Sequence, residues 1–242
     1  MEEFLTWRGT NRRRRRREKG DAGALHPRTV QKDRAVLGRL FKIAKGRKWV
    51  DHNPVYETER PEAEGRNYVV LSRDEYERFL EACAHHERLS LFALLLGETA
   101  VRSDSEALWL KWRDVDFATG YITIVSGRGG HRTKSGKTRK VPISPRLAEA
   151  LRDYFAKYRL ATQSEWIFHH QTSARTHKRG ERIKSLRDAF DRAARKAELP
   201  ENFVQHDLRH TRLTWWAEEG RNPVWIQLVA GHSDLATTMG YI

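Results

Sequence analysis

Apolar residues recur at helical spacing along most of this chain, with charged residues between them. The first clear stripe runs from Pro27 to Gly46, and proline in a first turn and glycine at an end are typical helix boundaries. The spacing predicts further helices after Ser72 and over residues 89–96, 145–158, 183–197, 206–218, 223–230 and from 233 onward. The chain is therefore expected to be mainly helical.

Short segments in the middle of the chain have the pattern of strands. Residues 121–125 alternate apolar and polar side chains, and residues 140–143 could pair with them across a basic, glycine-containing stretch. Residues 166–168 could form another short strand. Together with the helices, these segments predict a mainly α fold with a small antiparallel β-sheet, an α+β class.

Two pairs of residues have the spacing of a helix capping box. Ser72 and Glu75 precede apolar residues at helical spacing, and Ser103 and Glu106 precede another apolar stretch. Each pair predicts a helix N-terminus.

The balance of charge indicates a polyanionic partner. The sequence has 46 Lys and Arg against 32 Asp and Glu, a net charge of +14. One run of consecutive arginines should stay extended, because its like charges repel, until a phosphate backbone neutralises it. The alternative is a solvated arm without a specific role. These candidate DNA-binding residues are Arg12, Arg13, Arg14, Arg15, Arg16 and Arg17.

The charge and the linker-like composition of residues 54–66 divide the chain. That stretch is polar and contains proline and glycine, and the residues up to 66 carry a net charge of +8 against +6 for the remainder. We expect a basic, disordered arm over 1–25, a small and incomplete helical part with its linker over 26–66, and a larger domain over 67–242.

The composition also indicates the cellular compartment in which the protein is expected. Cys83 is the single cysteine, which excludes an internal disulfide framework and favours a reducing compartment. The longest apolar run is far shorter than the ~20 residues of a membrane span, and no apolar segment follows the arginines as it would in a secretory signal. We therefore expect a cytoplasmic protein without a membrane partner.

A second basic segment lies between the two main predicted strands. Residues 127–140 contain six Lys and Arg side chains and no acidic one. Charge of one sign at this density predicts a hairpin or loop that contacts phosphates, although a merely soluble loop is the alternative. The candidate DNA-binding residues here are Arg128, Arg132, Lys137 and Arg139.

The sequence His206-Asp-Leu-Arg209-His210 opens a predicted helix, so its two histidines and its arginine share roughly one face. Histidines at this spacing can bind zinc, but an arginine between them would repel a cation. An anion such as phosphate suits the face better, because arginine offers a planar pair of donors. Buried, hydrogen-bonded histidines without a chemical role are the remaining alternative. No metal site is predicted.

Further motifs make this segment specific. His206-Asp-Leu-Arg209-His, followed by Gly-His232 and then Tyr241, resembles the carboxy-terminal signature of the tyrosine recombinase, or phage integrase, family. Upstream, Glu98-Thr-Ala-Val-Arg102, the Trp-Arg-Asp-Val-Asp turn over 112–116 and the lysine hairpin over 133–142 resemble the family's other motifs in the same order. The resemblance covers residues 67–242, and residues 26–54 look like the end of the family's helical core-binding domain.

The resemblance implies a covalent mechanism. Tyr241 would attack a DNA phosphate and form a 3′-phosphotyrosyl intermediate, which needs no metal, ATP or other cofactor. The other implied roles are phosphate clamps for Arg102 and Arg209, a phosphate donor for His232, acceptance of the tyrosine proton for His206, and protonation of the leaving 5′ oxygen for Lys134.

The spacing around the first arginine departs from the family pattern. Glu106 follows Arg102 by four residues, whereas the family commonly has three, and counting back from Trp112 would place Ser103 in the arginine's position. We assign the role to Arg102, because a turn before a helix can absorb one residue. Glu106 is expected to support the arginine or to cap the helix, and not to react.

The leading hypothesis is a site-specific DNA recombinase or integrase that acts on double-stranded DNA and assembles there, as a tetrameric synapse in the family. One alternative is a non-catalytic DNA-binding remnant of such an enzyme. Another is a metal-dependent hydrolase using His206, His210 and His232. Because the sequence stops one residue after Tyr241, we also expect a poorly held tyrosine and a monomer in solution.

Overall fold

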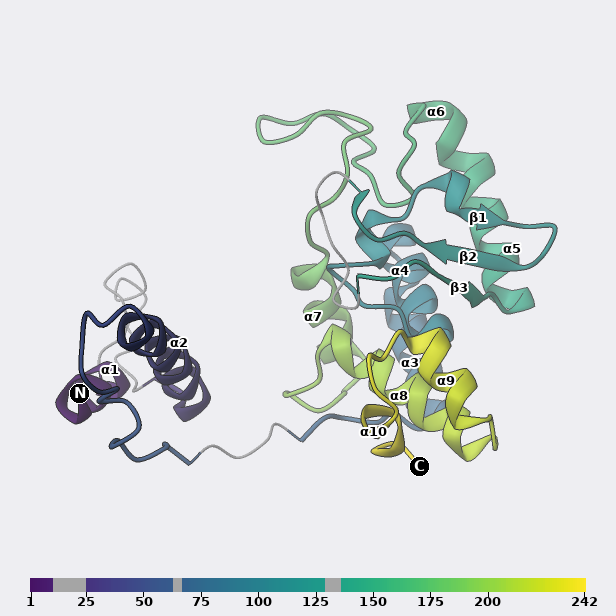
Figure 1. Ribbon diagram of the computed structural model, residues 1–242. Coiled ribbons are helices and arrows are strands. Elements are labelled where there is room, and N and C mark those ends of the chain that lie inside the picture. Colours follow the sequence, from purple (N-terminus) through teal and green to yellow (C-terminus); the bar gives the residue numbers. More distant parts are fainter. Residues whose placement is uncertain (11–24, 63–66, 129–135) are drawn as a thin grey trace. The chain divides into compact units, whose positions relative to one another are not determined.

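The structure is a computed structural model, which describes residues 1–10, 25–62, 67–128 and 136–242 (Figure 1). The chain forms two compact units, Met1–Asn67 and Tyr68–Ile242. We call them unit 1 and unit 2. The division falls one residue after the boundary predicted from the composition of the linker.

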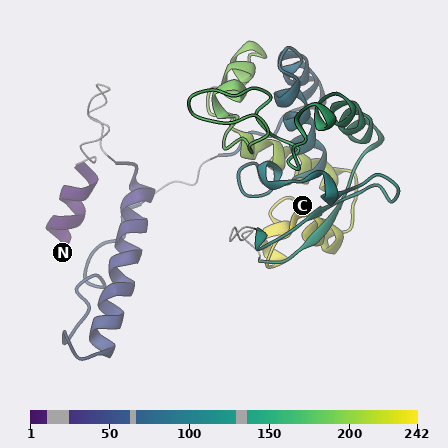
Figure 2. The ribbon, with the colours of Figure 1, turned by 90° about the horizontal axis from the view of Figure 1, so that it is seen from above.

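The described residues of unit 1 form the helices α1 (Glu2–Thr10) and α2 (Pro27–Gly46), and α1 lies alongside α2 (Figures 1 and 2). The helix α2 has the predicted bounds, whereas α1 occupies part of the arm that we expected to be disordered. The side chain of Leu5 is buried, and Arg8 forms a 2.8 Å ion pair with Asp33. This contact with α2 explains why the segment is helical. The arginines from Arg12 to Arg17 lie outside the described residues.

The segment after α2 folds back on that helix. Asn53 donates from Nδ2 to the carbonyl oxygen of Gly38 at 2.9 Å, and Arg34 donates to the carbonyl oxygens of Val55 and Thr58 at 2.8 and 2.7 Å. The part of the predicted linker up to Thr58 therefore packs against α2. Much of the apolar stripe of α2 remains exposed, with Leu40 at 58%, as expected for a helix with few neighbours.

Unit 2 is built around the apolar helix α4 (Glu87–Thr99), which contacts α3, α5 and α8. Every residue from Leu91 to Gly97 is buried, as is typical of a helix surrounded by protein. The other helices of the unit are α3 (Arg73–Cys83), α5 (Pro145–Tyr154), α6 (Leu160–Thr162), α7 (Arg187–Lys196), α8 (Gln205–Glu218), α9 (Pro223–Ala230) and α10 (Ala236–Met239).

Most helix boundaries follow from local signals. The capping box of Ser72 and Glu75 is confirmed, with the Ser72 hydroxyl accepting from the amide of Glu75 at 3.2 Å and the Glu75 carboxylate accepting from the amide of Ser72 at 2.8 Å. Asn222 caps α9 as its position before Pro223 suggests. The helix predicted over 145–158 is confirmed and extends further, because α5 continues without a break as a π-helix, Phe155–Arg159, and then as α6.

The predicted sheet is confirmed and has one more strand than expected. Its strands β1 (Val115–Asp116), β2 (Tyr121–Ile124) and β3 (Arg139–Pro142) pair antiparallel in the order β1-β2-β3. Ile122 pairs with Val141 and both are buried, so one face of the sheet covers the core. Residues 166–168 form no strand, and only an isolated bridge joins Trp166 to Lys111.

No helix in the described ranges combines the length and the apolar composition that crossing a membrane requires.

Gly97 lies where α4 meets the ring of Tyr76. A Cβ atom at this glycine would lie 2.3 Å from the Tyr76 hydroxyl and 2.5 Å from two of its ring carbons. The ring has little freedom to move, since it is buried and packs edge-on against Trp215 at 5.4 Å. Glycine is therefore required here by packing, in a helix where alanine would otherwise be preferred.

Gly97→Ala should consequently lower stability by about 1–3 kcal/mol, the usual cost of overpacking a core. Thermal unfolding followed by circular dichroism would measure the change. Gly46→Ala is the control, because nothing lies within 4 Å of that position and the variant should unfold at the same or a higher temperature. An unchanged Tm for Gly97→Ala would contradict this account of the packing.

Candidate active site

Four separate segments of unit 2 bring the predicted site residues together. They are the turn after α4, the strand β3, the first turns of α8 and the segment from the end of α9 to Tyr241. Figure 1 shows β3 beside α9, and the two elements are in contact. Within the described residues, the side chains at this site are Arg102, Glu106, Arg139, His206, Arg209, His210, His232 and Tyr241.

The carboxylate of Glu106 binds two of the arginines at the site. Its side chain is fully buried and accepts from Arg139 at 2.9 and 2.7 Å, from the Arg102 guanidinium at 2.9 Å and from the Arg102 amide at 2.9 Å. Burial alone would raise the pKa of this carboxyl group, but the hydrogen bonds and charge of Arg139, joined by those of Arg102, hold the pKa at about 2. Glu106 is therefore ionised and orients two arginines.

This arrangement corrects the predicted capping box of Ser103 and Glu106. The 3-10 helix Ala107–Trp109 has no side-chain cap, because its Glu106 carboxylate binds the arginines instead. The turn that begins at Arg102 closes over four and five residues, which leaves room for the additional residue between Arg102 and Glu106. The carbonyl oxygen of Arg102 accepts from the amides of both Glu106 and Ala107, at 3.1 and 2.9 Å. Arg102 is thus the residue of this turn whose guanidinium binds Glu106 beside Arg139.

Hydrogen bonds to backbone carbonyl groups hold the side chain of Arg209 in place. The residue is 2% exposed, and its guanidinium donates to the carbonyl oxygens of Ala100, at the end of α4, and Ala230, at the end of α9. Burial and the nearby charge of Arg102 lower its pKa to about 9, so it remains charged at neutral pH. The neutral carbonyl partners leave its positive charge available to an anion.

His232 lies in the segment after α9. Burial and the charges of Arg209 and Arg102 lower its pKa to about 4, so the imidazole is neutral at pH 7. Its Nδ1 lies 2.8 Å from the hydroxyl of the buried Thr238. If that hydroxyl donates, the ring proton is on Nε2, and the neutral histidine retains one donor for a phosphate.

Tyr241 packs against these groups, contrary to the expectation of a poorly held side chain. Its hydroxyl is 2.7 Å from Nδ1 of His210, and its ring lies nearly parallel to that of His232, with centroids 6.1 Å apart. Burial raises the pKa of the hydroxyl, whereas Arg209 and Arg102 act to lower it. The role of His210 in holding the tyrosine was missed from the sequence, although its spacing from His206 marked the shared face.

The basic segment supplies fewer exposed cations than its composition suggests. Arg128 binds Asp114 through both terminal nitrogens at 2.5 and 2.6 Å, and Arg139 binds Glu106, so both predicted phosphate contacts are instead engaged in largely buried ion pairs. Lys137 is exposed. The remaining two predicted residues, Arg132 and Lys134, lie outside the described residues.

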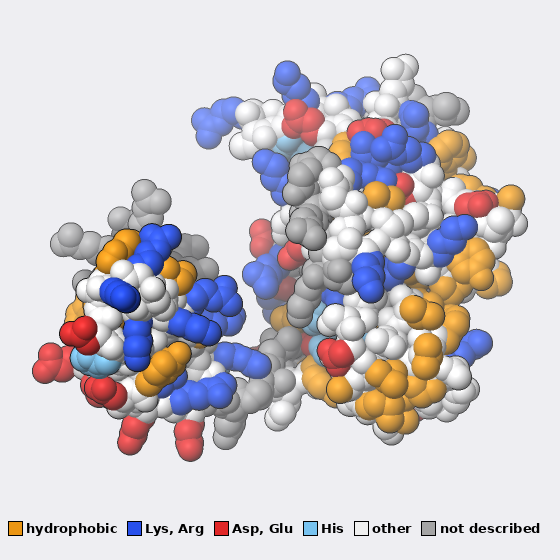
Figure 3. All heavy atoms as spheres, viewed as in Figure 1, with side chains coloured by type: hydrophobic (Ala, Val, Ile, Leu, Met, Phe, Trp, Pro, Cys, Tyr) orange, Lys and Arg blue, Asp and Glu red, His pale blue; other side chains and the backbone are white. Residues whose placement is uncertain are grey.

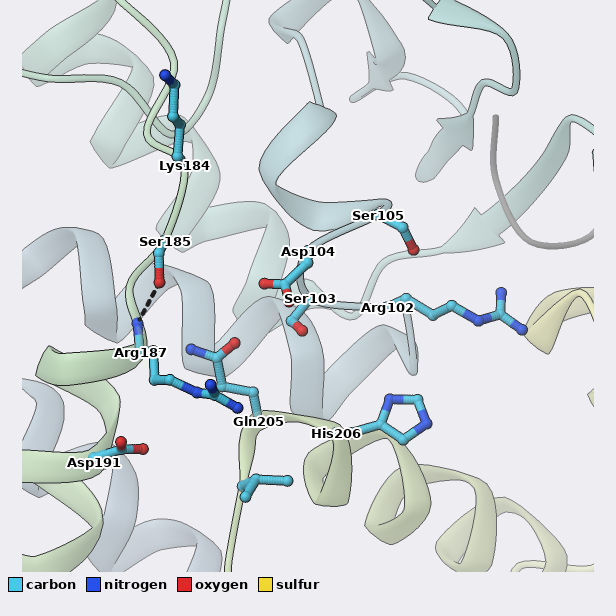
Figure 4. A pocket seen from close by; sticks show the side chains of 11 residues that line it. Arg102, Ser103, Asp104, Ser105, Lys184, Ser185, Arg187, Asp191, Gln205 and His206 are labelled. Atoms are coloured by element: carbon cyan, nitrogen blue, oxygen red, sulfur yellow. Dashed lines mark hydrogen bonds between the residues drawn. The ribbon is translucent and has the colours of Figure 1, made fainter. Parts of the chain in front are cut away.

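A hollow of about 490 Å³ opens beside the site. Figure 4 shows Lys184, Ser185 and Arg187 on one side and the Ser103–Asp104 turn on the other, with His206 at the base on α8. The guanidinium of Arg102 points away from the Lys184 side, towards the yellow C-terminal part of the chain (Figure 4). The hollow therefore adjoins the arginine cluster, and its lining carries Lys184 and Arg187 as well as the acidic Asp104 and Asp191.

Within the ranges that the structure describes, no three His, Cys, Asp or Glu side chains form a group that could hold a metal ion. The spacing of His206 and His210 instead places the two rings edge to face, with their centroids 5.0 Å apart. On the visible surface in Figure 3, Lys and Arg side chains are scattered over unit 2, and on unit 1 they lie among hydrophobic and acidic side chains. The arginine cluster suits an anionic ligand.

Known proteins share this sequence and fold. The chain is 31% identical over 222 residues to y4qK of Sinorhizobium fredii, whose name describes an integrase/recombinase, across 90% of this chain and 65% of that protein. It is 29% identical to the tyrosine recombinase XerC of Halalkalibacterium halodurans, across 88% of this chain and 70% of XerC. The chain thus spans slightly less than two thirds of y4qK.

Solved structures agree with the fold. The crystal structure of XerA recombinase has a TM-score of 0.59 and 27% identity, covering 72% of this chain and 59% of that one. The integrase of transposon Tn1549 has a TM-score of 0.75 at 20% identity, covering 99% and 78% of the two chains. Residues 69–242, most of the sequence, match the phage integrase family. The chain belongs to the phage integrase family, which includes the tyrosine recombinases.

Proposed function

We propose that this protein is a site-specific recombinase that cuts and rejoins double-stranded DNA through a phosphotyrosyl intermediate. The observation that carries the proposal is the position of the Tyr241 hydroxyl among groups that suit a phosphate. Arg102 and Arg209 are near enough for their charges to oppose the rise in its pKa, and the neutral imidazole of His232 lies beside its ring.

The chemistry requires no external energy source. The phenolic oxygen would form a bond to phosphorus while the bond from phosphorus to the 5′ oxygen breaks, and the phosphotyrosine would keep that bond energy for rejoining. Arg102 and Arg209 would stabilise the charge that develops on the non-bridging oxygens. Lys134 remains a predicted donor to the leaving oxygen, and His206 a predicted ligand of the phosphate or acceptor of the tyrosine proton.

The relatives support DNA as the substrate. The Tn1549 integrase was solved in complex with transposon right end DNA, and a λ integrase dimer was solved bound to a core site. For this protein, we infer a double-stranded DNA partner, assembly of several protomers on it, and action in the cytoplasm on nucleoid DNA. The net charge of +8 on the residues up to 66, and Arg102, Lys184 and Arg187 at the hollow, support contact with the DNA backbone.

Trapping of a covalent adduct tests the proposal. The protein would be incubated with nicked duplexes of candidate target sites, from which the cut fragment diffuses away, and an adduct would be sought on a denaturing gel. We expect an adduct that forms equally in the presence of a chelator. DNA binding without any adduct would favour a non-catalytic remnant, whereas cleavage that the chelator abolishes would favour a metal-dependent hydrolase.

Arg102→Ala should lower the rate of adduct formation about 10²-fold or more, which is typical of losing a donor that stabilises a developing oxyanion. Single-turnover cleavage would measure the rate. Ser103→Ala is the matched control, since the alternative count from Trp112 places that residue in the arginine's position, and it should react close to the wild-type rate. Normal cleavage by Arg102→Ala would remove the role from this arginine.

A further inference from the structure

The Tyr241 hydroxyl has a hydrogen-bonding partner that the sequence motifs do not assign. It lies 2.7 Å from Nδ1 of His210, whereas the motif assigns its proton to His206. We propose that His210 is the base that takes the phenolic proton of Tyr241 during DNA cleavage. This inference rests on the proposed recombinase function.

The helix α8 gives its two histidines different surroundings. They are one turn apart, and the His206 ring is exposed, while that of His210 is half-buried. The ring of Tyr68 stacks on His210 with centroids 4.2 Å apart and planes 8° from parallel. Tyr241 lies on the same imidazole at 5.6 Å and 28°. The imidazole is therefore restrained by Tyr68 while its Nδ1 contacts the nucleophile.

Tyr241 needs a base because its surroundings do not ionise it. Burial raises the pKa of the hydroxyl above its ordinary value of 10, and the arginines only oppose that rise. Near neutral pH the attacking group is thus a neutral phenol. A group that accepts its proton must lie within hydrogen-bond distance of the oxygen, and Nδ1 of His210 lies at 2.7 Å.

The cleavage step then balances. The phenolic oxygen bonds to phosphorus as its proton passes to Nδ1 of His210, and the bond between phosphorus and the 5′ oxygen breaks. The departing oxygen takes a proton from a protein donor or from water, and the rejoining step returns the His210 proton to the phenol. His206 is exposed and lines the hollow together with Arg102, where it would contact the phosphate.

Two substitutions separate a base from a hydrogen-bond acceptor or a packing group. His210→Asn keeps an oxygen acceptor near the position of Nδ1 but cannot hold a proton, and His210→Phe keeps a ring for Tyr68 to stack on. Both should slow adduct formation at least about 10²-fold, the lower range for general base catalysis. Wild-type rates in His210→Asn would overturn the proposal, because an acceptor alone would then suffice. DNA affinity and Tm, measured in parallel, exclude loss of folding.

A substrate with sulfur in place of the bridging 5′ oxygen distinguishes loss of the base from loss of the acid. Its thiolate leaves without being protonated, so the acid is no longer needed. Lys134→Ala, the comparator for the predicted acid, should recover towards the wild-type rate on it. The His210 variants should remain slow, because the phenol must still lose its proton. Recovery of the His210 variants on this substrate would show that they affect the leaving group and would overturn the proposal.

The free protein provides a test that does not depend on cleavage. In ¹⁵N-histidine-labelled protein at the pH used for cleavage, Nδ1 of His210 should have the chemical shift of an unprotonated nitrogen and should move in Tyr241→Phe. A proton on Nδ1, or no change in the variant, would overturn the assignment of His210. If no DNA gives an adduct with the wild type, the recombinase function fails, while this spectrum still decides whether His210 is placed to accept the proton.

Discussion

Tyr241→Phe should abolish the covalent adduct with DNA and leave DNA affinity nearly unchanged. The substitution removes the oxygen that would attack phosphorus, together with its 2.7 Å hydrogen bond to His210. The ring contacts with His210, His232 and Tyr68 involve carbon atoms that phenylalanine retains. Denaturing gels would report the adduct, and a fluorescence anisotropy titration with the same duplex would report the affinity.

Tyr121→Phe provides the control for this experiment. Tyr121 is 40% exposed on β2, away from the arginine cluster, so its variant should form the adduct as the wild type does. An adduct that persists in Tyr241→Phe would show that another side chain attacks the DNA. The proposed mechanism would then be wrong even if the family assignment stands.

Glu106→Gln should destabilise unit 2 by roughly 3–5 kcal/mol, the range found when one partner of a buried ion pair is removed. The amide cannot neutralise the guanidinium groups of Arg102 and Arg139, and its NH₂ group would face their donors. Urea denaturation would measure the loss. Glu77→Gln breaks a bidentate pair with Arg146 whose side chains are 51% exposed, so it should cost less than about 1 kcal/mol.

The carboxyl group of Glu106 should also make the free energy of unfolding of unit 2 depend on pH. Because folding lowers the pKa of Glu106 from 4.5 to about 2, its contribution is complete above pH 4.5 and is lost as the pH falls towards 2. The free energy of unfolding of the wild type should therefore fall more steeply over that interval than that of Glu106→Gln. Parallel slopes would mean that the carboxylate is not held ionised by the two arginines.

Periodicity predicted the helices whose caps and apolar stripes lie within their own sequence, even where, as in α2, much of the stripe is exposed. The pattern over α2, α3 and α9 was sufficient because caps and apolar stripes are local properties of a sequence. The pattern missed β1, which has only two residues, and α1, which buries Leu5 as its single core residue. Elements this short depend on distant neighbours for their stability, and the local sequence does not contain those neighbours.

At the candidate site, the sequence likewise did not show which charged side chains would be buried. The motifs identified Arg102, Arg209, His232 and Tyr241, because their order along the chain is specific. A run of basic residues does not reveal which side chains turn inward. Arg139 does so because its partner carboxylate lies 33 residues earlier in the sequence, a pairing that only the folded chain creates.

The two carbonyl groups that hold Arg209 come from residues 109 and 21 positions away along the chain. The arginine therefore acquires its orientation only after the ends of α4 and α9 have both docked against α8. Any opening that separates α9 from the body of unit 2 removes one of the two carbonyls while the rest of the helix remains formed. The orientation of Arg209 is therefore lost in any partly opened molecule in which α9 has separated from α4 and α8, even where those two helices remain packed together.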